Sequence, residues 1–192
     1  MAVDARWEQI RRLPIDHTFT TSSTNEVYSA QWLTVPLSWL PQGFHLTESR
    51  LETLGPFYFR RLMALSGRFI QVREEEHEIC FEVALVRLPL LCFAPAQTTE
   101  KQGGGTVCYA ITGGLMLAPG APEGGMLCMS LLPTDAGLRV GMEVQQYHAR
   151  IAGTDSTRRF RRWLYEMTQA RLHHIIANDF VRQLAMALVT GR

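Results

Sequence analysis

Three polar residues near the C-terminus, Arg171, His174 and Asn178, are spaced three and four apart and so follow one line along an α-helix. With Phe160 as the zero of a helical wheel turning about 100° per residue, Arg171 lies within about 20° and Asn178 almost at zero. His174 falls about 40° to the other side. The spacing therefore predicts a polar line on the apolar side of a helix.

Such a line can do chemistry inside an apolar pocket. The guanidinium of Arg171 would hold a carboxylate, phosphate or enolate oxygen, and His174 would exchange a proton near neutral pH. These two are the candidate catalytic residues, and Asn178 would orient a bound ligand. A structural interpretation stays open, in which Arg171 extends to water and His174 and Asn178 bond sheet carbonyls or each other.

Four further residues are candidates for the wall of a ligand pocket. Tyrosine offers an apolar ring with a polar tip, and methionine fills irregular gaps. The candidates are Tyr109, Tyr147, Met142 and Met167. Ordinary core packing explains the same residue types, so their role depends on where the fold places them.

Other reactive residue types form no recognisable constellation. The four cysteines, Cys80, Cys92, Cys108 and Cys128, contain no C-x-x-C pair and lie in apolar stretches, which favours reduced core thiols over a disulfide or a zinc site. The acidic run REEEHE, residues 73 to 78, is typical of a charged hairpin end. No dinucleotide, phosphate-loop or metalloprotease motif occurs, so we expect no cofactor and no metal.

Size and charge restrict the class of protein. The chain has 192 residues, 46% of them hydrophobic, with a formal net charge of +1 and a pI near 7.8. This composition predicts one domain and no long-range field for nucleic acid. The N-terminal stretch MAVDARWEQIRRL lacks the apolar run of a signal peptide, and no stretch is long enough to span a membrane. We therefore expect a cytoplasmic protein without a membrane span.

The elements that must position these residues follow from periodicity. Residues 1–13 form a helical extension, residues 14–153 form strands with two short helices near 49–66, and residues 154–190 form a long helix capped by Thr154 or Asp155. Turn sequences separate short apolar runs, which indicates antiparallel hairpins. These runs are RFIQV, EICFEVALV, LPLLCFA, TVCYAI, GLMLA, MLCMSLL and LRVGMEVQQY. Pro89 is expected to interrupt one strand.

This order of elements resembles the START-type helix-grip (SRPBCC-like) superfamily of lipid- and small-molecule-binding proteins. The segment FRRWLYEMTQARLHHIIANDFVRQL looks like its gripping helix. The resemblance implies an α+β fold in which a curved antiparallel sheet wraps around the C-terminal helix and leaves a cavity between them. The alternative is a small β-barrel with flanking helices, which can also hold one ligand.

Three functions are compatible with this fold. The first is binding of an apolar, lipid-like or polyketide-like molecule in the cavity. The second is an enzyme that uses the cavity as a cyclase, isomerase or hydratase, with His174 as the acid–base and Arg171 as the electrostatic stabiliser. The third is a non-catalytic interaction module or homodimer, in which exposed Trp32, Trp39 and Phe44 contact a protein partner.

Overall fold

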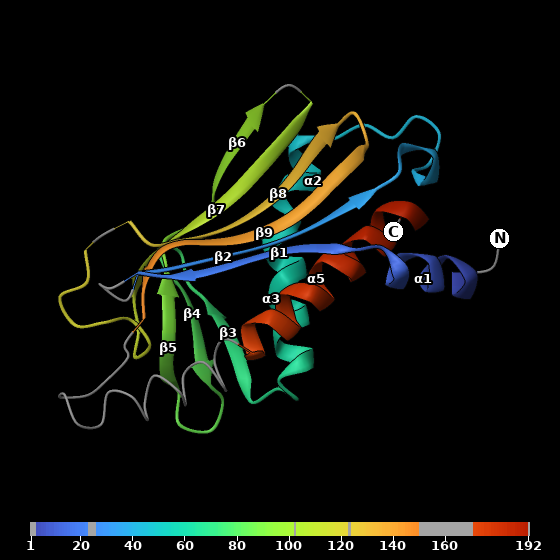
Figure 1. Cartoon of the computed structure of the whole chain (residues 1–192). Helices are drawn as coiled ribbons and strands as arrows, with labels where there is room; N and C mark the ends of the chain where they lie inside the picture. The colour runs from blue at the N-terminus through green and yellow to red at the C-terminus, as the bar shows by residue number, and fades with distance from the viewer. Residues whose placement is uncertain (1–2, 23–25, 102, 123, 150–170, 192) are drawn as a thin grey trace.

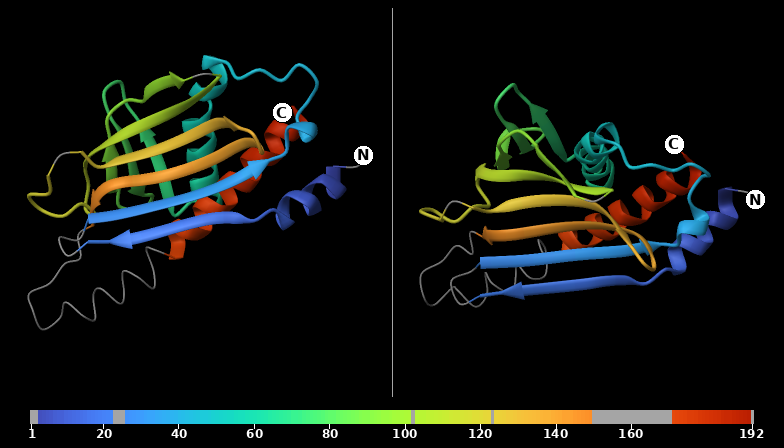
Figure 2. Two further views of the ribbon diagram at one scale, coloured as in Figure 1. Left: turned by 45° about the horizontal axis from the view of Figure 1, so that its top comes forward. Right: turned by 90° about the horizontal axis from the view of Figure 1, so that it is seen from above.

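One large antiparallel sheet covered by helices on a single face makes up the structure, an α+β fold (Figures 1 and 2). A computed structural model describes residues 3–22, 26–101, 103–122, 124–149 and 171–191. The described part of the expected C-terminal helix lies across the sheet, and its earlier part, residues 154–170, is outside the described residues.

The sheet contains nine strands. They are β1 (Ile15–Thr21), β2 (Glu26–Val35), β3 (Ile70–Glu74), β4 (Ile79–Val83), β5 (Leu88–Phe93), β6 (Gln97–Lys101), β7 (Gly104–Gly113), β8 (Met126–Thr134) and β9 (Gly137–His148). The order is β1-β2-β9-β8-β7-β5-β4-β3, and β6 pairs with β7 outside this path. Because β1 and β3 lie at opposite ends of this order, the sheet is open and the alternative of a small closed barrel is wrong.

Helices gather on the inner face of the sheet. They are α1 (Val3–Arg12), the short 3-10 helix η1 (Leu37–Trp39), α2 (Glu48–Glu52), α3 (Leu54–Leu65) and α5 (Arg171–Thr190). α5 contacts β2 and β9 and is flanked by α1 and α3. Figure 2 shows α3 and α5 on the same side of the strands. No helix among the described residues is long and apolar enough to cross a lipid bilayer.

The run LRVGMEVQQY forms β9, and its first half alternates between buried and half-buried side chains. Leu138, Val140 and Met142 are buried, whereas Arg139 and Glu143 are only half-buried on the opposite face. Register extends this inner face across the sheet, because Met142 is opposite Gln31 of β2 and Met129 of β8. The apolar inner face is what α5 covers.

The buried stripe of α5 differs from the one predicted. Its fully or almost fully buried residues are Ile176, Ala177, Phe180, Val181, Leu184, Ala185 and Leu188. Ile175 is 57% exposed, and His174 and Asn178 lie at the border of the stripe and are half-buried. His174 and Asn178 therefore lie beside the buried stripe of α5, and Phe160, the angular reference of the prediction, is outside the described residues.

The cysteines are paired, contrary to the expectation of reduced thiols. Cys80 bonds Cys92 across β4 and β5, and Cys108 bonds Cys128 across β7 and β8. Each pair occupies directly opposed register positions. Opposed residues on neighbouring antiparallel strands are close enough to be bridged, a proximity that only the strand pairing creates.

Three strand predictions also differ from the structure. The run GLMLA, residues 114–118, forms only an isolated bridge between Leu117 and Ala149, because its glycines and the following turn sequence favour bends. The polar strand β6 was not expected, since it carries no apolar run. Pro89 lies within β5, where the pairing with β4 shifts register and does not require its missing N–H.

The aromatic residues proposed as an exposed contact surface are half-buried. Trp32 has the guanidinium of Arg139 at 4.4 Å from its ring, and Trp39 and Phe44 pack against the main core. A guanidinium also lies over each of the latter two rings, from Arg6 and from Arg50. The expectation that they are exposed is therefore wrong.

Candidate functional site

A cluster of polar side chains lies where α5 meets the edge of the sheet, and we call it the polar cluster. It consists of His17 of β1, Ser29 and Gln31 of β2, and His174 and Asn178 of α5. His17 and Gln31 are direct register partners and therefore share the inner face. The ring of His174 packs edge-on against that of His17, with centroids 4.5 Å apart, and Asn178 Nδ2 lies 2.8 Å from His174 Nε2.

Three buried polar atoms of the polar cluster have no hydrogen-bond partner among the residues that the structure describes. They are Gln31 Oε1, His174 Nδ1 and Asn178 Oδ1. Gln31 is completely buried, and only its amide nitrogen is satisfied, by Ser29 Oγ at 3.1 Å. A buried polar atom without a partner costs free energy comparable to a lost hydrogen bond, so three of them in one cluster require an explanation.

The environment keeps His174 neutral. Burial lowers its pKa from the ordinary value, and the neighbouring His17 lowers it further. An amide nitrogen can only donate, so with Asn178 oriented as in the structure, Nε2 of His174 accepts and Nδ1 carries the ring proton. The cluster therefore presents one free donor, at His174, and two free acceptors, at Asn178 and Gln31.

This set of groups favours a neutral polar partner. A hydroxyl or a primary amide both donates and accepts, so it can bond a free donor and a free acceptor at once. A carboxylate only accepts, and it would lie against the two unpaired oxygens without a cation from the cluster to balance it. The cluster extends from buried Gln31 to His17, which is exposed on the edge strand. The shortest path from solvent to the buried atoms of the cluster therefore passes His17.

Two clamps hold α5 in position beside the cluster. On one side the guanidinium of Arg182 donates to the backbone oxygens of Ile10 and Arg11 at the end of α1, each at 2.7 Å. On the other side Asp179 accepts from Arg61 of α3 at 2.7 Å, and both side chains are largely buried. The two clamps fix how far His174 and Asn178 lie from β1.

Tyr109 was predicted to line the wall of a pocket, but the structure places it in the aromatic core under α3. Its ring lies 5.4 Å from that of Phe59, and a Cβ on Gly55 would collide with its hydroxyl. Burial, with a smaller contribution from Glu74, raises the pKa of Tyr109 to about 12. The hydroxyl therefore stays protonated at neutral pH, away from the polar cluster.

The other predicted wall residues have different positions. Met142 is buried on the inner face directly opposite Gln31, so it is an apolar neighbour of the polar cluster. Tyr147 belongs to a separate small core with Val27, and its hydroxyl donates to the carbonyl of Met116 at 2.6 Å. Two predicted residues are not placed: Met167 is outside the described residues, and so is the side chain of Arg171, whose backbone begins α5.

Sequence reasoning missed His17, Ser29 and Gln31. The available signal was alternation, because Val27, Ser29, Gln31, Leu33 and Val35 occupy every second position of a strand and form one face. Two polar residues on an otherwise aliphatic face indicate an inward-facing polar site. No local pattern marks His17, since only strand pairing brings it next to Gln31.

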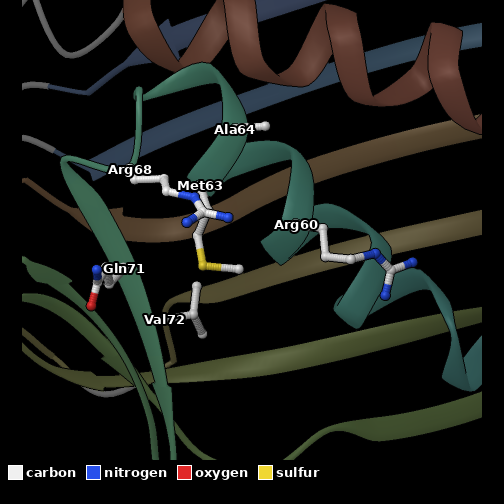
Figure 3. A pocket seen from close by; sticks show the side chains of 6 residues that line it. All are labelled: Arg60, Met63, Ala64, Arg68, Gln71 and Val72. Carbon is white, nitrogen blue, oxygen red and sulfur yellow. The ribbon is translucent and has the colours of Figure 1, made fainter.

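Three hollows lined by described residues lie away from the polar cluster. One of about 450 Å³ lies between α3 and β3 and is lined by Arg60, Met63, Ala64, Arg68, Gln71 and Val72 (Figure 3). Another of about 520 Å³ lies between α3 and the C-terminal half of α5. The third, about 340 Å³, lies on the outer face of the sheet beside Trp32 and the Cys108–Cys128 bond.

Comparison with known proteins adds no functional assignment. No protein-family model matches the chain, and no curated protein sequence is significantly similar to it. Among solved structures, the chain is similar to protein Ms6760 from Mycobacterium smegmatis, with a TM-score of 0.38 and 9% identity over 91% of this chain and 99% of that one. It is also similar to CalU16 from Micromonospora echinospora, with a TM-score of 0.27 and 11% identity over 94% and 97%.

Proposed function

We propose that this protein binds a mostly apolar small molecule at the polar cluster, between the sheet and α5, through one neutral polar group of the ligand. The observation that carries the proposal is the set of three unpaired buried atoms on Gln31, His174 and Asn178. A ligand hydroxyl or amide would satisfy the His174 donor and at least one acceptor. The arrangement of an open antiparallel sheet and a covering C-terminal helix supports a helix-grip mode of binding.

Apolar surfaces next to the cluster would hold the rest of the ligand. Met142 lies beside Gln31, and Phe19 occupies the register position opposite Ser29 on the same face. Because the unpaired atoms are enclosed by protein, entry requires His17 to move from the ring of His174. His17 is exposed on an edge strand, so its side chain can rotate without breaking the sheet.

A set of matched probes tests the polar part of the proposal. We expect 2-naphthol, which carries one hydroxyl, to bind the full chain more tightly than 2-methylnaphthalene or 2-naphthoate. Replacing Asn178 by Leu should reduce the preference for the hydroxyl by a factor of about two to ten, since a hydrogen bond contributes roughly 0.5–1.5 kcal/mol. Gln183→Leu, on the other border of α5, is the control and should leave the preference unchanged.

The outcome decides between ligand binding and a purely structural cluster. The proposal fails if none of the probes binds, or if Asn178→Leu keeps the preference of the unchanged protein. Native mass spectrometry of the purified chain gives an independent measurement, because a retained natural ligand appears as a defined added mass. A catalytic role of His174 would show as conversion of that ligand on incubation, with conversion lost in His174→Ala.

The compartment stays a prediction. The sequence favours the cytoplasm, whereas two disulfides are typical of oxidising compartments. Thiol titration distinguishes the cytoplasm from an oxidising compartment. The protein is isolated from its natural source under thiol-trapping conditions and titrated denatured and unreduced. Four free thiols support the cytoplasm and none supports an oxidising compartment.

A further inference from the structure

Exposed apolar residues lie at the connection between β4 and β5 and just before β3, and we call them the apolar tip. It consists of Phe69, Leu85, Val86 and Leu88. Leu85 is 89% exposed, Val86 69% and Phe69 57%. A hydrogen bond from Ala84 N to Phe69 O joins the loop before β3 to this hairpin, so Phe69 lies beside the turn that carries Leu85 and Val86.

Half of the exposed large apolar side chains in the described part of the chain belong to the apolar tip. Single exposed apolar residues are ordinary, but several on one projection mark a contact surface. In Figure 1 the loop between β4 and β5 lies at the lower margin of the molecule, away from α1 and both termini. The apolar tip is therefore separate from the polar cluster at β1 and α5.

The charges around the apolar tip have one sign. Arg68 and Arg87 flank it and are exposed, and residues 65–72 and 83–90 contain no Asp or Glu. The nearest acid in the sequence, Glu82, is buried and accepts a hydrogen bond from Arg73 at 3.3 Å. Of the charged residues in these two segments, a surface that meets the apolar tip will therefore encounter only cations.

The hollow between α3 and β3 adjoins the apolar tip through Arg68, and its lining contains a further cation, Arg60, farther along α3. Its lining includes Arg60 and Arg68, the amide of Gln71, and the apolar Met63 and Val72. Figure 3 shows the guanidinium of Arg68 beside the Met63 side chain, with Arg60 extending from α3 farther along the helix. Among the described residues neither guanidinium has a carboxylate partner. The hollow thus places the guanidinium of Arg68 beside the apolar side chains of Met63 and Val72.

We propose that the apolar tip docks this protein on an anionic lipid surface. Leu85, Val86 and Phe69 enter the boundary between headgroups and acyl chains, while Arg68 and Arg87 lie among the phosphates. A protein partner is less well matched, because protein interfaces are commonly anchored by fully packed Trp, Tyr and Arg side chains, whereas this surface projects and is mainly aliphatic. The proposal does not depend on a ligand at the polar cluster.

Vesicle co-sedimentation of the full chain tests the proposal. The probes are vesicles of phosphatidylcholine alone and of equal parts phosphatidylcholine and phosphatidylserine. We expect binding to the anionic vesicles that the double variant Leu85→Ser, Val86→Ser weakens at least about tenfold, because each aliphatic side chain moved from water to hydrocarbon contributes about that factor. The control is Leu37→Ser, since Leu37 is 58% exposed at the other end of the sheet.

A second arm tests the charges. Arg87→Gln should weaken binding about fivefold on the anionic vesicles, as expected for one cation near such a surface, whereas Arg12→Gln on α1 should not. The proposal is overturned if the full chain fails to bind anionic vesicles, or if the Leu37 control loses as much binding as the double variant. It is also overturned if the double variant changes only the oligomeric state in solution, which would assign the apolar tip to a second copy of the chain.

Discussion

Arg182 joins the two ends of the described chain, and its replacement by methionine should release α1 from the rest of the protein. The guanidinium donates to the backbone oxygens of Ile10 and Arg11 at 2.7 Å and of Leu13 at 3.4 Å. Ile10 and Arg11 belong to the last turn of α1 and Leu13 follows it; Ile10 O also accepts from Leu13 N at 3.1 Å. Carbonyls in the last turn of a helix lack their usual helical partners, and a cation is favourable there. Methionine keeps the apolar stem and removes the donors.

The expected loss follows from these bonds. Hydrogen bonds to a charged group contribute roughly 1.5–3 kcal/mol, and because water can reach part of this site we expect the lower half, about 2 kcal/mol. For a chain of this size that corresponds to a Tm lower by about 4–8 °C. The ten residues of α1 are too few for a stable isolated helix, so the loss should concentrate there.

Hydrogen exchange of residues 3–12, combined with thermal unfolding, measures this effect. Arg182→Met should raise hydrogen exchange throughout α1. Arg182→Lys should keep only part of the protection of α1, since an ammonium lacks the planar fork that reaches three carbonyls. Arg12→Met, which removes an exposed cation from the same helix, is the control. This role of Arg182 is refuted if α1 stays protected from hydrogen exchange in Arg182→Met and the Tm of that variant equals the Tm of the control.

Three further changes have defined outcomes. Gly55→Ala should lower the free energy of unfolding in urea by about 1–3 kcal/mol, because the new methyl group overlaps the Tyr109 hydroxyl, and adding Tyr109→Phe should restore part of it. Replacing Cys108 and Cys128 together by Ala should cost about 3 kcal/mol in the same assay, as expected for a closed loop of this length. The pKa of His174 is lowered in the folded state, so the unfolded chain binds a proton first as the pH falls through the ordinary histidine value. Stability should therefore decrease as the pH falls below about 6.5, less steeply in His174→Phe, and an unchanged pH dependence in that variant would contradict the assignment.

Of the polar cluster, the sequence predicted only the two residues that lie on α5. Spacing brought His174 and Asn178 to attention, and the structure places them 2.8 Å apart at Nε2 and Nδ2. Their partners on the sheet, His17 and Gln31, are more than 140 residues away in the chain and have no local signature. Strand pairing alone brings them to α5, so no spacing rule could have found the complete cluster.

Periodicity and turn chemistry in the sequence determined the class of fold: antiparallel strands with an alternating inner face, two short helices and a terminal amphipathic helix. These are local properties, because side-chain direction repeats every two residues in a strand and every 3.6 in a helix. Tertiary structure decided which residues oppose one another. It paired Cys80 with Cys92 and Cys108 with Cys128, turned Ile175 to solvent, and buried Gln31 Oε1 where no described residue bonds it. Those outcomes depend on register and on the rotation of α5 against the sheet, and both are set by packing across the whole domain rather than by neighbouring residues.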